Sequence, residues 1–181
     1  MRKAINLLLI SFVVLVACQQ QTTTHSGLAS YEDKDALVAA AKEVITEITI
    51  EDFKNMYDGE DYFVLVDIRE PAEYDAGYIP GAASVPRGVL EFQIAKEEVW
   101  DEMGLYIPEK ADPIVLNCRS GGRSALAAKS LMELGYEKVF SLQGGFNAWK
   151  EAYPELIEKI YVEEEAGYQE VATEAEAAGG C

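Results

Sequence analysis

From about residue 47 onwards, short runs of hydrophobic residues alternate with more polar segments whose pattern is typical of helices. Continuous apolar runs bounded by turn residues are typical of strands that are buried on both faces. Runs of this kind cover residues 63–66, 83–85, 114–116 and 139–142, and residues 47–50 are a candidate for one more strand. The pattern therefore predicts several short, buried strands.

The segments between these runs carry signals for helices. Pro71 suits the first position of a helix and Glu73 its first turn. A second helix is expected over 124–134, ending before Gly135, with Ala127, Leu131 and Leu134 on one face. Alternating strands and helices predict an α/β fold with a central parallel sheet and helices on both faces, in three layers.

Ahead of the first strand, residues 31–45 predict an amphipathic helix. Its apolar positions recur at helical spacing and are Leu37, Ala41, Val44 and Ile45. Beyond Pro154 the composition becomes acidic and rich in alanine, which favours a tail over a packed element. Residues 154–181 are therefore expected to form an acidic C-terminal tail that ends at Cys181.

The N-terminus resembles a bacterial lipoprotein signal peptide. Arg2 and Lys3 precede an apolar run of 13 residues, which as a helix spans only about 20 Å of a bilayer core of about 30 Å. The run ends in Leu-Val-Ala-Cys at residues 15–18, which is similar to a lipobox. The resemblance implies cleavage after residue 17, lipidation of Cys18, and a protein exported and anchored to a bacterial membrane, on its periplasmic side or at the cell surface. The alternative is a plain secretory signal with an incidental cysteine.

Composition excludes several classes of function. A formal net charge of -17 argues against a nucleic-acid partner, because phosphate backbones require clustered Lys and Arg. The only histidine, His25, lies in the polar tether of residues 18–30. Catalytic arrangements that pair serine or cysteine with histidine are therefore not expected, and neither is a structural zinc site, a bound metal or a cofactor.

The stretch Asn-Cys-Arg-Ser-Gly-Gly-Arg-Ser at residues 117–124 is the main candidate for chemistry. It follows a predicted strand and opens a predicted helix, and ligands of parallel sheets bind beyond the carboxyl ends of the strands. An ordinary thiol is only about 3% thiolate at neutral pH. Arg119, Arg123, inward-turned N–H groups at the glycines and the helix dipole would all stabilise a thiolate of Cys118 and an anionic substrate beside it. The alternative is a small, inert, buried cysteine.

Three segments together resemble the rhodanese domain of sulfurtransferases. Residues 67–82 are similar to the first signature of that family, residues 118–124 to its active-site loop, and residues 142–149 to its closing signature. The resemblance covers residues 46–153 and implies a single-domain, rhodanese-like fold. One position departs from the family pattern: Tyr78 stands where most members have histidine, and we interpret it as structural.

The resemblance implies a thiosulfate sulfurtransferase-like enzyme. The Cys118 thiolate would attack the outer sulfur of thiosulfate or a persulfide, and the resulting persulfide would pass its sulfur to cyanide or a thiol. The residues implied to bind the anionic donor and the persulfide are Arg119, Ser120, Gly121, Gly122, Arg123 and Ser124. Asp67 and Arg69 would support the loop, or would simply form a buried ion pair. The glycines at 144 and 145 would permit a tight turn before a core Trp149.

Two other functions stay open on the sequence. A phosphatase or arsenate reductase of the related cell-cycle phosphatase type uses a similar loop, but with one more residue between cysteine and arginine. A non-catalytic binding module of the rhodanese-like type usually lacks the cysteine that this chain has at position 118. Oligomeric state is not predicted.

Overall fold

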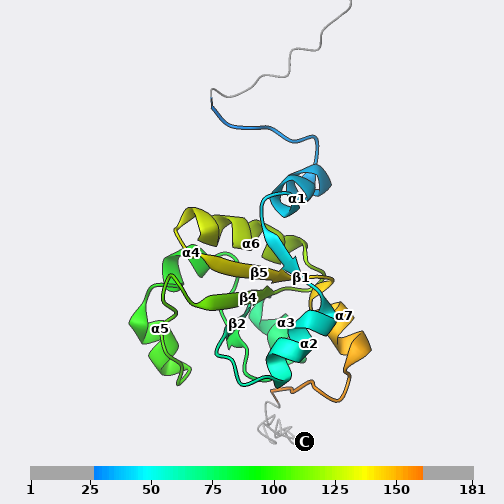
Figure 1. Ribbon diagram of the computed structural model, residues 1–181, viewed down its shortest axis with the longest axis vertical. Helices are drawn as coiled ribbons and strands as arrows, with labels where there is room; N and C mark the ends of the chain where they lie inside the picture. The colour runs from blue at the N-terminus through cyan, green and yellow to red at the C-terminus, as the bar shows by residue number, and fades with distance from the viewer. Residues whose placement is uncertain (1–26, 161–181) are drawn as a thin grey trace, which may run out of the picture. The chain divides into compact units, whose positions relative to one another are not determined.

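Five parallel strands form the centre of the protein in the computed structural model, which describes residues 27–160 (Figure 1). Their order across the sheet is β1-β5-β4-β2-β3, and every pairing is parallel. The strands are β1 Thr46–Ile48, β2 Val64–Asp67, β3 Ala83–Ser84, β4 Pro113–Asn117 and β5 Lys138–Leu142. The signal segment, Cys18, His25, most of the acidic tail and Cys181 lie outside the described residues.

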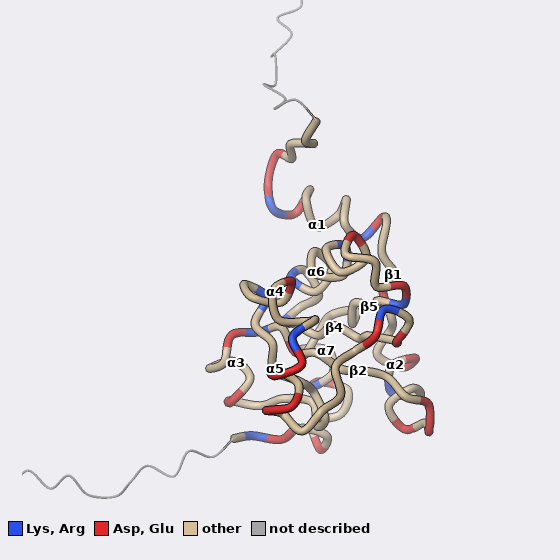
Figure 2. Tube along the Cα trace, turned by 90° about the vertical axis from the view of Figure 1, so that its left-hand side faces the viewer, with Lys and Arg blue, Asp and Glu red and all other residues tan. Residues whose placement is uncertain are grey.

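Helices cover both faces of this sheet, which confirms the predicted three-layer α/β fold. The helices are α1 Lys34–Lys42, α2 Ile50–Asp58, α3 Pro71–Asp75, α4 Leu90–Gln93, α5 Glu97–Glu102, α6 Gly122–Glu133 and α7 Gly145–Ala152. Figure 1 shows α6 over one face and α2 and α7 over the other. Acidic and basic positions are interspersed along the described chain (Figure 2).

Successive residues of the strands point to opposite faces and so build two cores. Val64 and Val66 of β2 join the cluster beneath α4, α5 and α6, which includes Trp100 and Leu131. Leu65 joins the cluster beneath α2 and α7. In that second cluster Phe53, Tyr57, Trp149 and Tyr153 form a chain of aromatic contacts. The predicted core position of Trp149 agrees with its complete burial.

Several element boundaries differ from the sequence-based prediction. The run at 47–50 is split, because β1 ends at Ile48 and the Thr49 hydroxyl accepts the Asp52 N–H at 3.0 Å, which begins α2. The helix expected over 31–45 is α1, capped by the Asp33 carboxylate, and Val44 lies beyond its end with 56% of its surface exposed. Ala127 and Leu131 of the predicted shared face are buried, whereas Leu134 is exposed because α6 ends at Glu133.

The packed region continues past residue 153, where the sequence-based division begins the acidic tail. Tyr78 and Glu158 exchange two backbone hydrogen bonds, of 2.8 and 3.0 Å. The indole N–H of Trp149 donates to the Leu156 carbonyl at 3.2 Å, and Leu156 and Ile157 pack against the second core. Residues 154–160 therefore belong to the domain. Within residues 27–160, no helix is both long and apolar enough to cross a membrane.

Candidate active site

The loop of residues 117–124 lies at the carboxyl end of β4, between β4 and α6, as the sequence predicts. Cys118 follows the last residue of β4 and is 1% exposed. Gly121, the residue before α6, has φ +91°, a left-handed conformation that favours glycine. This turn bends the loop back over the sulfur of Cys118.

Two backbone N–H groups and one hydroxyl group surround the Cys118 Sγ atom. The Gly121 N–H donates to it at 3.2 Å and the Ser124 N–H at 3.4 Å. The Ser124 hydroxyl lies 3.4 Å from the same sulfur. Backbone N–H groups fixed around a sulfur favour its anionic form, so this geometry supports the predicted thiolate cradle. Arg119 and Ser120 of the same loop are exposed.

A second turn, at the start of α7, forms hydrogen bonds with the backbone of the reactive loop. The Phe146 N–H donates to the Cys118 carbonyl at 2.7 Å, and the Asn147 N–H donates to the Arg119 carbonyl at 3.1 Å. Both donors lie in the first turn of α7, which follows the turn at Gly144 and Gly145. The segment of the third sequence signature therefore has a structural role, because the amino end of α7 supports the backbone of the reactive loop.

Arg123 forms a bidentate ion pair with Glu73 of α3. Its two terminal nitrogens lie 2.8 and 2.9 Å from the two carboxylate oxygens. The hydrogen bonds from Arg123 lower the pKa of Glu73. The hydrogen bond to Glu73 in turn raises the pKa of Arg123, and the charge of the Cys118 thiolate adds to this effect. Sequence reasoning gave Glu73 only a place in a helix; the structure makes it the partner that orients Arg123.

Asp67 and Arg69 form a buried ion pair, with exposed fractions of 0% and 3%. Arg69 binds both carboxylate oxygens of Asp67 at 2.7–2.9 Å and also donates to the carbonyls of Glu73 and Gly77. Its guanidinium lies 3.9 Å from the centre of the Phe146 ring. These contacts join β2, α3 and α7 and so support the structural interpretation. The pair holds in place the two helices that carry the partners of the loop.

Ser141 of β5 is a site residue that sequence reasoning missed. Its hydroxyl donates to the Ser124 hydroxyl oxygen at 2.8 Å, and both side chains are completely buried. Ser124 lies within 3.1 Å of the Gly121 carbonyl and 3.4 Å of the Cys118 sulfur. The only signal in the sequence is a single hydroxyl in the otherwise apolar run of residues 139–142. Ser141 is therefore a positioning residue that acts on Cys118 through Ser124.

Replacing Ser141 with alanine is expected to lower the rate at which Cys118 takes up sulfur by about threefold. The change removes one buried hydrogen bond to Ser124, and such a bond contributes about 0.5–1.5 kcal/mol. The measurement is the rate of sulfur uptake by Cys118 from thiosulfate, followed by intact mass. Ser141→Thr keeps the hydroxyl and should restore the rate, whereas an uptake rate that Ser141→Ala leaves unchanged would contradict this role.

Tyr78 has the structural role that we assigned to it. Its hydroxyl donates to the Glu158 carboxylate at 2.9 Å, and its ring stacks on Tyr74 with 4.3 Å between ring centres. The hydrogen bond to Glu158 raises the pKa of Tyr78. Tyrosine in place of the usual histidine thus ties this segment to residues 154–160.

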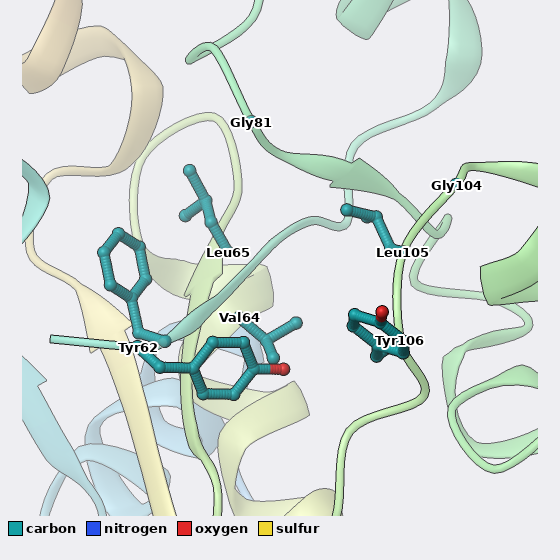
Figure 3. Close-up of a pocket in the computed structure, with 8 residues that line it drawn as sticks. Tyr62, Val64, Leu65, Gly81, Gly104, Leu105 and Tyr106 are labelled. Carbon is teal, nitrogen blue, oxygen red and sulfur yellow. The ribbon is translucent and has the colours of Figure 1, made fainter. Parts of the chain in front are cut away.

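An apolar pocket lies elsewhere in the fold (Figure 3). Tyr62, Leu65, Leu105 and Tyr106 are among the residues that line it. It opens beside the start of β2, whereas Cys118 follows the end of the neighbouring parallel strand β4. The pocket and the reactive loop therefore lie at opposite ends of the parallel strands.

Comparison with known proteins gives one family and a consistent set of relatives. The model of the rhodanese-like domain matches residues 49–152. A thiosulfate sulfurtransferase, GlpE, from Pseudoalteromonas translucida (strain TAC 125) is 37% identical over 113 residues, which are 62% of this chain and 95% of that protein. A sulfurtransferase from Allochromatium vinosum is 35% identical over 106 residues, covering 59% of this chain and 89% of that protein.

A solved structure from Rhodopseudomonas palustris CGA009 is also similar. It is 32% identical, has a TM-score of 0.56, and covers 69% of this chain and 94% of its own. That protein is described as being of unknown function and as a possible tyrosine phosphatase.

Proposed function

Because the chain belongs to the rhodanese-like domain family, we propose that it is a sulfurtransferase that carries sulfur on Cys118. The observation that supports this most directly is the cradle at the Cys118 sulfur, with N–H donors from Gly121 and Ser124 at 3.2 and 3.4 Å. Relatives at 35–37% identity are named sulfurtransferases, and one of them is named for thiosulfate.

The first step is an attack by the Cys118 thiolate on the outer sulfur of thiosulfate or of a persulfide. A new S–S bond forms on Cys118, the S–S bond of the donor breaks, and sulfite or a thiolate leaves with the electron pair. The same donors that stabilise the thiolate then surround the inner sulfur of the persulfide. Arg123 is paired with Glu73 but its side chain is 34% exposed beside the loop, so the anionic donor would share this cation with the carboxylate.

The second step returns the enzyme to its starting state. A thiolate or cyanide attacks the outer sulfur of the Cys118 persulfide, the bond between the two sulfurs breaks, and Cys118 leaves as a thiolate. Neither step needs an oxidant or a reductant. Cys118 is therefore a nucleophile in the first step and a leaving group in the second, and a stabilised thiolate serves both roles.

Loop length favours sulfur transfer over phosphate chemistry. Four residues stand between Cys118 and Arg123, and a phosphatase loop of the related type holds one more. The shorter ring suits a single sulfur atom better than a phosphate group. The similar structure from Rhodopseudomonas palustris is described as a possible tyrosine phosphatase, so phosphatase activity should be measured beside sulfur transfer.

Export and lipid anchoring through Cys18 are part of the proposal. They would place the enzyme where thiols oxidise readily. A cysteine that is 1% exposed, and that rests as a persulfide, is partly protected there. The acceptor would be a thiol that is kept reduced outside the cytoplasm.

The test is the intact mass of the full chain, in reduced form, before and after incubation with thiosulfate. We expect a gain of one sulfur, its location on Cys118 by peptide mapping, and its loss on adding cyanide. Protein alkylated at Cys118 beforehand is the control and should gain none. Efficient hydrolysis of an aryl phosphate without sulfur uptake would instead identify a phosphatase.

A further inference from the structure

The apolar pocket of Figure 3 combines exposed aromatic rings with an apolar floor, away from Cys118. Residues 62–65 form one wall and residues 104–106 the other, around a volume of about 220 Å³. The Tyr62 and Tyr106 side chains at its mouth are 56% and 88% exposed. Exposed aromatic residues beside an apolar pocket are typical of protein interaction sites.

A second pocket, of about 330 Å³, adjoins the first, because Gly81 and Leu105 line both. The second pocket is also lined by β3 and by Tyr74 and Met103. Tyr74 packs against the core beneath α2 and α7, whereas Met103 packs against the core beneath α4, α5 and α6. These two cores lie on opposite faces of the sheet. The second pocket therefore lies beyond the edge of the sheet, alongside β3.

Strand β3 leaves backbone groups available at this edge. It is the last strand of the sheet and pairs only with β2. The Val85 N–H donates to the Asp67 carbonyl of β2 at 3.0 Å, so the backbone of Ser84, one residue earlier, faces the other way. An edge of this kind can form hydrogen bonds with a further chain. The second pocket thus offers both apolar side chains and backbone partners to a peptide.

The segments that form the walls, residues 60–65 and 101–112, are acidic. They contain one cation, Lys110, whose ammonium lies 3.6 Å from the centre of the Tyr136 ring. Their carboxylates belong to Glu60, Asp61, Asp101, Glu102, Glu109 and Asp112. Among the salt bridges of residues 27–160, none includes any of these carboxylates. Their negative charge is therefore available to a ligand.

The electric field of these carboxylates reaches the first pocket. Burial raises the pKa of Tyr62, and the negative charges of Asp112 and Glu109 raise it further. An acidic rim favours a cationic ligand and repels an anionic one. The chain's own residues 161–181 contain several glutamates and neither Lys nor Arg. Charge therefore favours a separate, cationic partner over this segment.

We propose that the two pockets form a docking surface for a partner protein, which inserts a peptide segment with Lys or Arg on either side of apolar side chains. The apolar side chains enter the two pockets, and the cations meet the rim carboxylates and the faces of Tyr62 and Tyr106. The first pocket and Cys118 lie at opposite ends of the strands, so the reactive loop stays open when the partner is bound. This inference goes beyond sulfur transfer and does not depend on it.

The experiment measures the binding of a fluorescein-labelled peptide, Lys-Leu-Lys-Leu-Lys, to the full chain by fluorescence anisotropy. Tyr106→Ser is expected to raise Kd about tenfold, because an aromatic ring that packs on the peptide is lost. Phe92→Ser is the matched control, because Phe92 of α4 is 74% exposed and lines neither pocket. Its Kd should stay within about twofold of the original. The acidic peptide Glu-Leu-Glu-Leu-Glu should bind at least about tenfold more weakly than the cationic one.

Several results would overturn the inference. They are equal binding of the two peptides, equal weakening by both variants, or no binding of the cationic peptide at millimolar concentration. Displacement of the probe by a peptide of residues 161–181 would assign the surface to the chain's own tail, and self-association that Tyr106→Ser abolishes would assign it to a second copy; either also overturns it. Sulfur uptake by Cys118 is a separate readout that both variants should leave unchanged, and its absence in all samples refutes only the proposed function.

Discussion

Changing Cys118 to serine lowers sulfur transfer at least about 10⁴-fold, as we expect from the loss of a nucleophile on which both steps depend. Serine is similar in size to cysteine and can still accept hydrogen bonds from the N–H groups of Gly121 and Ser124. Its hydroxyl is not ionised near neutral pH and cannot form a persulfide. The loss corresponds to about 5 kcal/mol of transition-state stabilisation.

The measurement is the rate of thiocyanate formation from thiosulfate and cyanide, together with intact mass. Thermal unfolding of the variant supplies the control, because the midpoint should change by only a few degrees if the cradle stays intact. A variant that folds normally and keeps more than about 1% of the rate would mean that sulfur does not travel through Cys118.

Changing Gly145 to alanine is expected to destabilise the protein by about 4 kcal/mol and to disturb the reactive loop. The residue has φ +59°, and the left-handed conformation costs about 1–2 kcal/mol for alanine. Its new Cβ atom would lie 2.3 Å from the Cys118 carbonyl oxygen and 2.9 Å from the backbone of both Arg119 and Ser120. The loop must therefore move away, which breaks the hydrogen bonds from the first turn of α7.

Thermal unfolding should show a midpoint lower by about 10 °C for a domain of this size. Sulfur uptake by Cys118 should fall at least tenfold at a temperature where the variant is still folded. Gly104→Ala is the matched control: Gly104 has φ +69° and nothing within 4 Å of the added Cβ, so it isolates the conformational cost. If the two variants lose equal stability, the close packing of Gly145 against the backbone of the reactive loop does not contribute to stability, and this prediction is wrong.

The strands, α3 and α6 could be predicted from the sequence because their signals are local. Strands buried on both faces, such as β2 and β4, read as unbroken apolar runs. Pro71 and Glu73 mark the start of α3, where Glu73 also completes a capping box. The position of Cys118 at the end of a strand followed directly from the same reasoning.

The other helices gave weaker signals. Helices α4 and α5 have only four and six residues, too few to show a helical period. Helix α2 has nine residues, but its first apolar residue, Ile50, extends the run of β1, and the boundary depends on a cap by Thr49. Buried Trp100 of α5 donates to the Ile94 carbonyl, a partner that only the folded chain provides.

Contacts across the site could not be read from the sequence because they join distant segments. Glu73 and Arg123 are 50 residues apart and meet only once α3 and α6 pack on the sheet. Ser141 becomes part of the site through the pairing of β4 with β5. Val38 of α1 comes close to Gly122 only through the packing of α1 against α6. Local patterns contain none of this information.

The order of the strands has a consequence for folding kinetics. The edge strand β1 pairs only with β5, and the residues that it contacts lie about 90 positions further along the chain. Closing so long a loop is slow, and contacts of high sequence separation form late. During synthesis from the amino end, β1 cannot pair with β5 until almost the whole domain has left the ribosome. The first turn of α7, which supports the loop of Cys118, follows β5 in the chain. We therefore expect the pairing of β1 and the completion of the reactive loop to be late steps that occur close together.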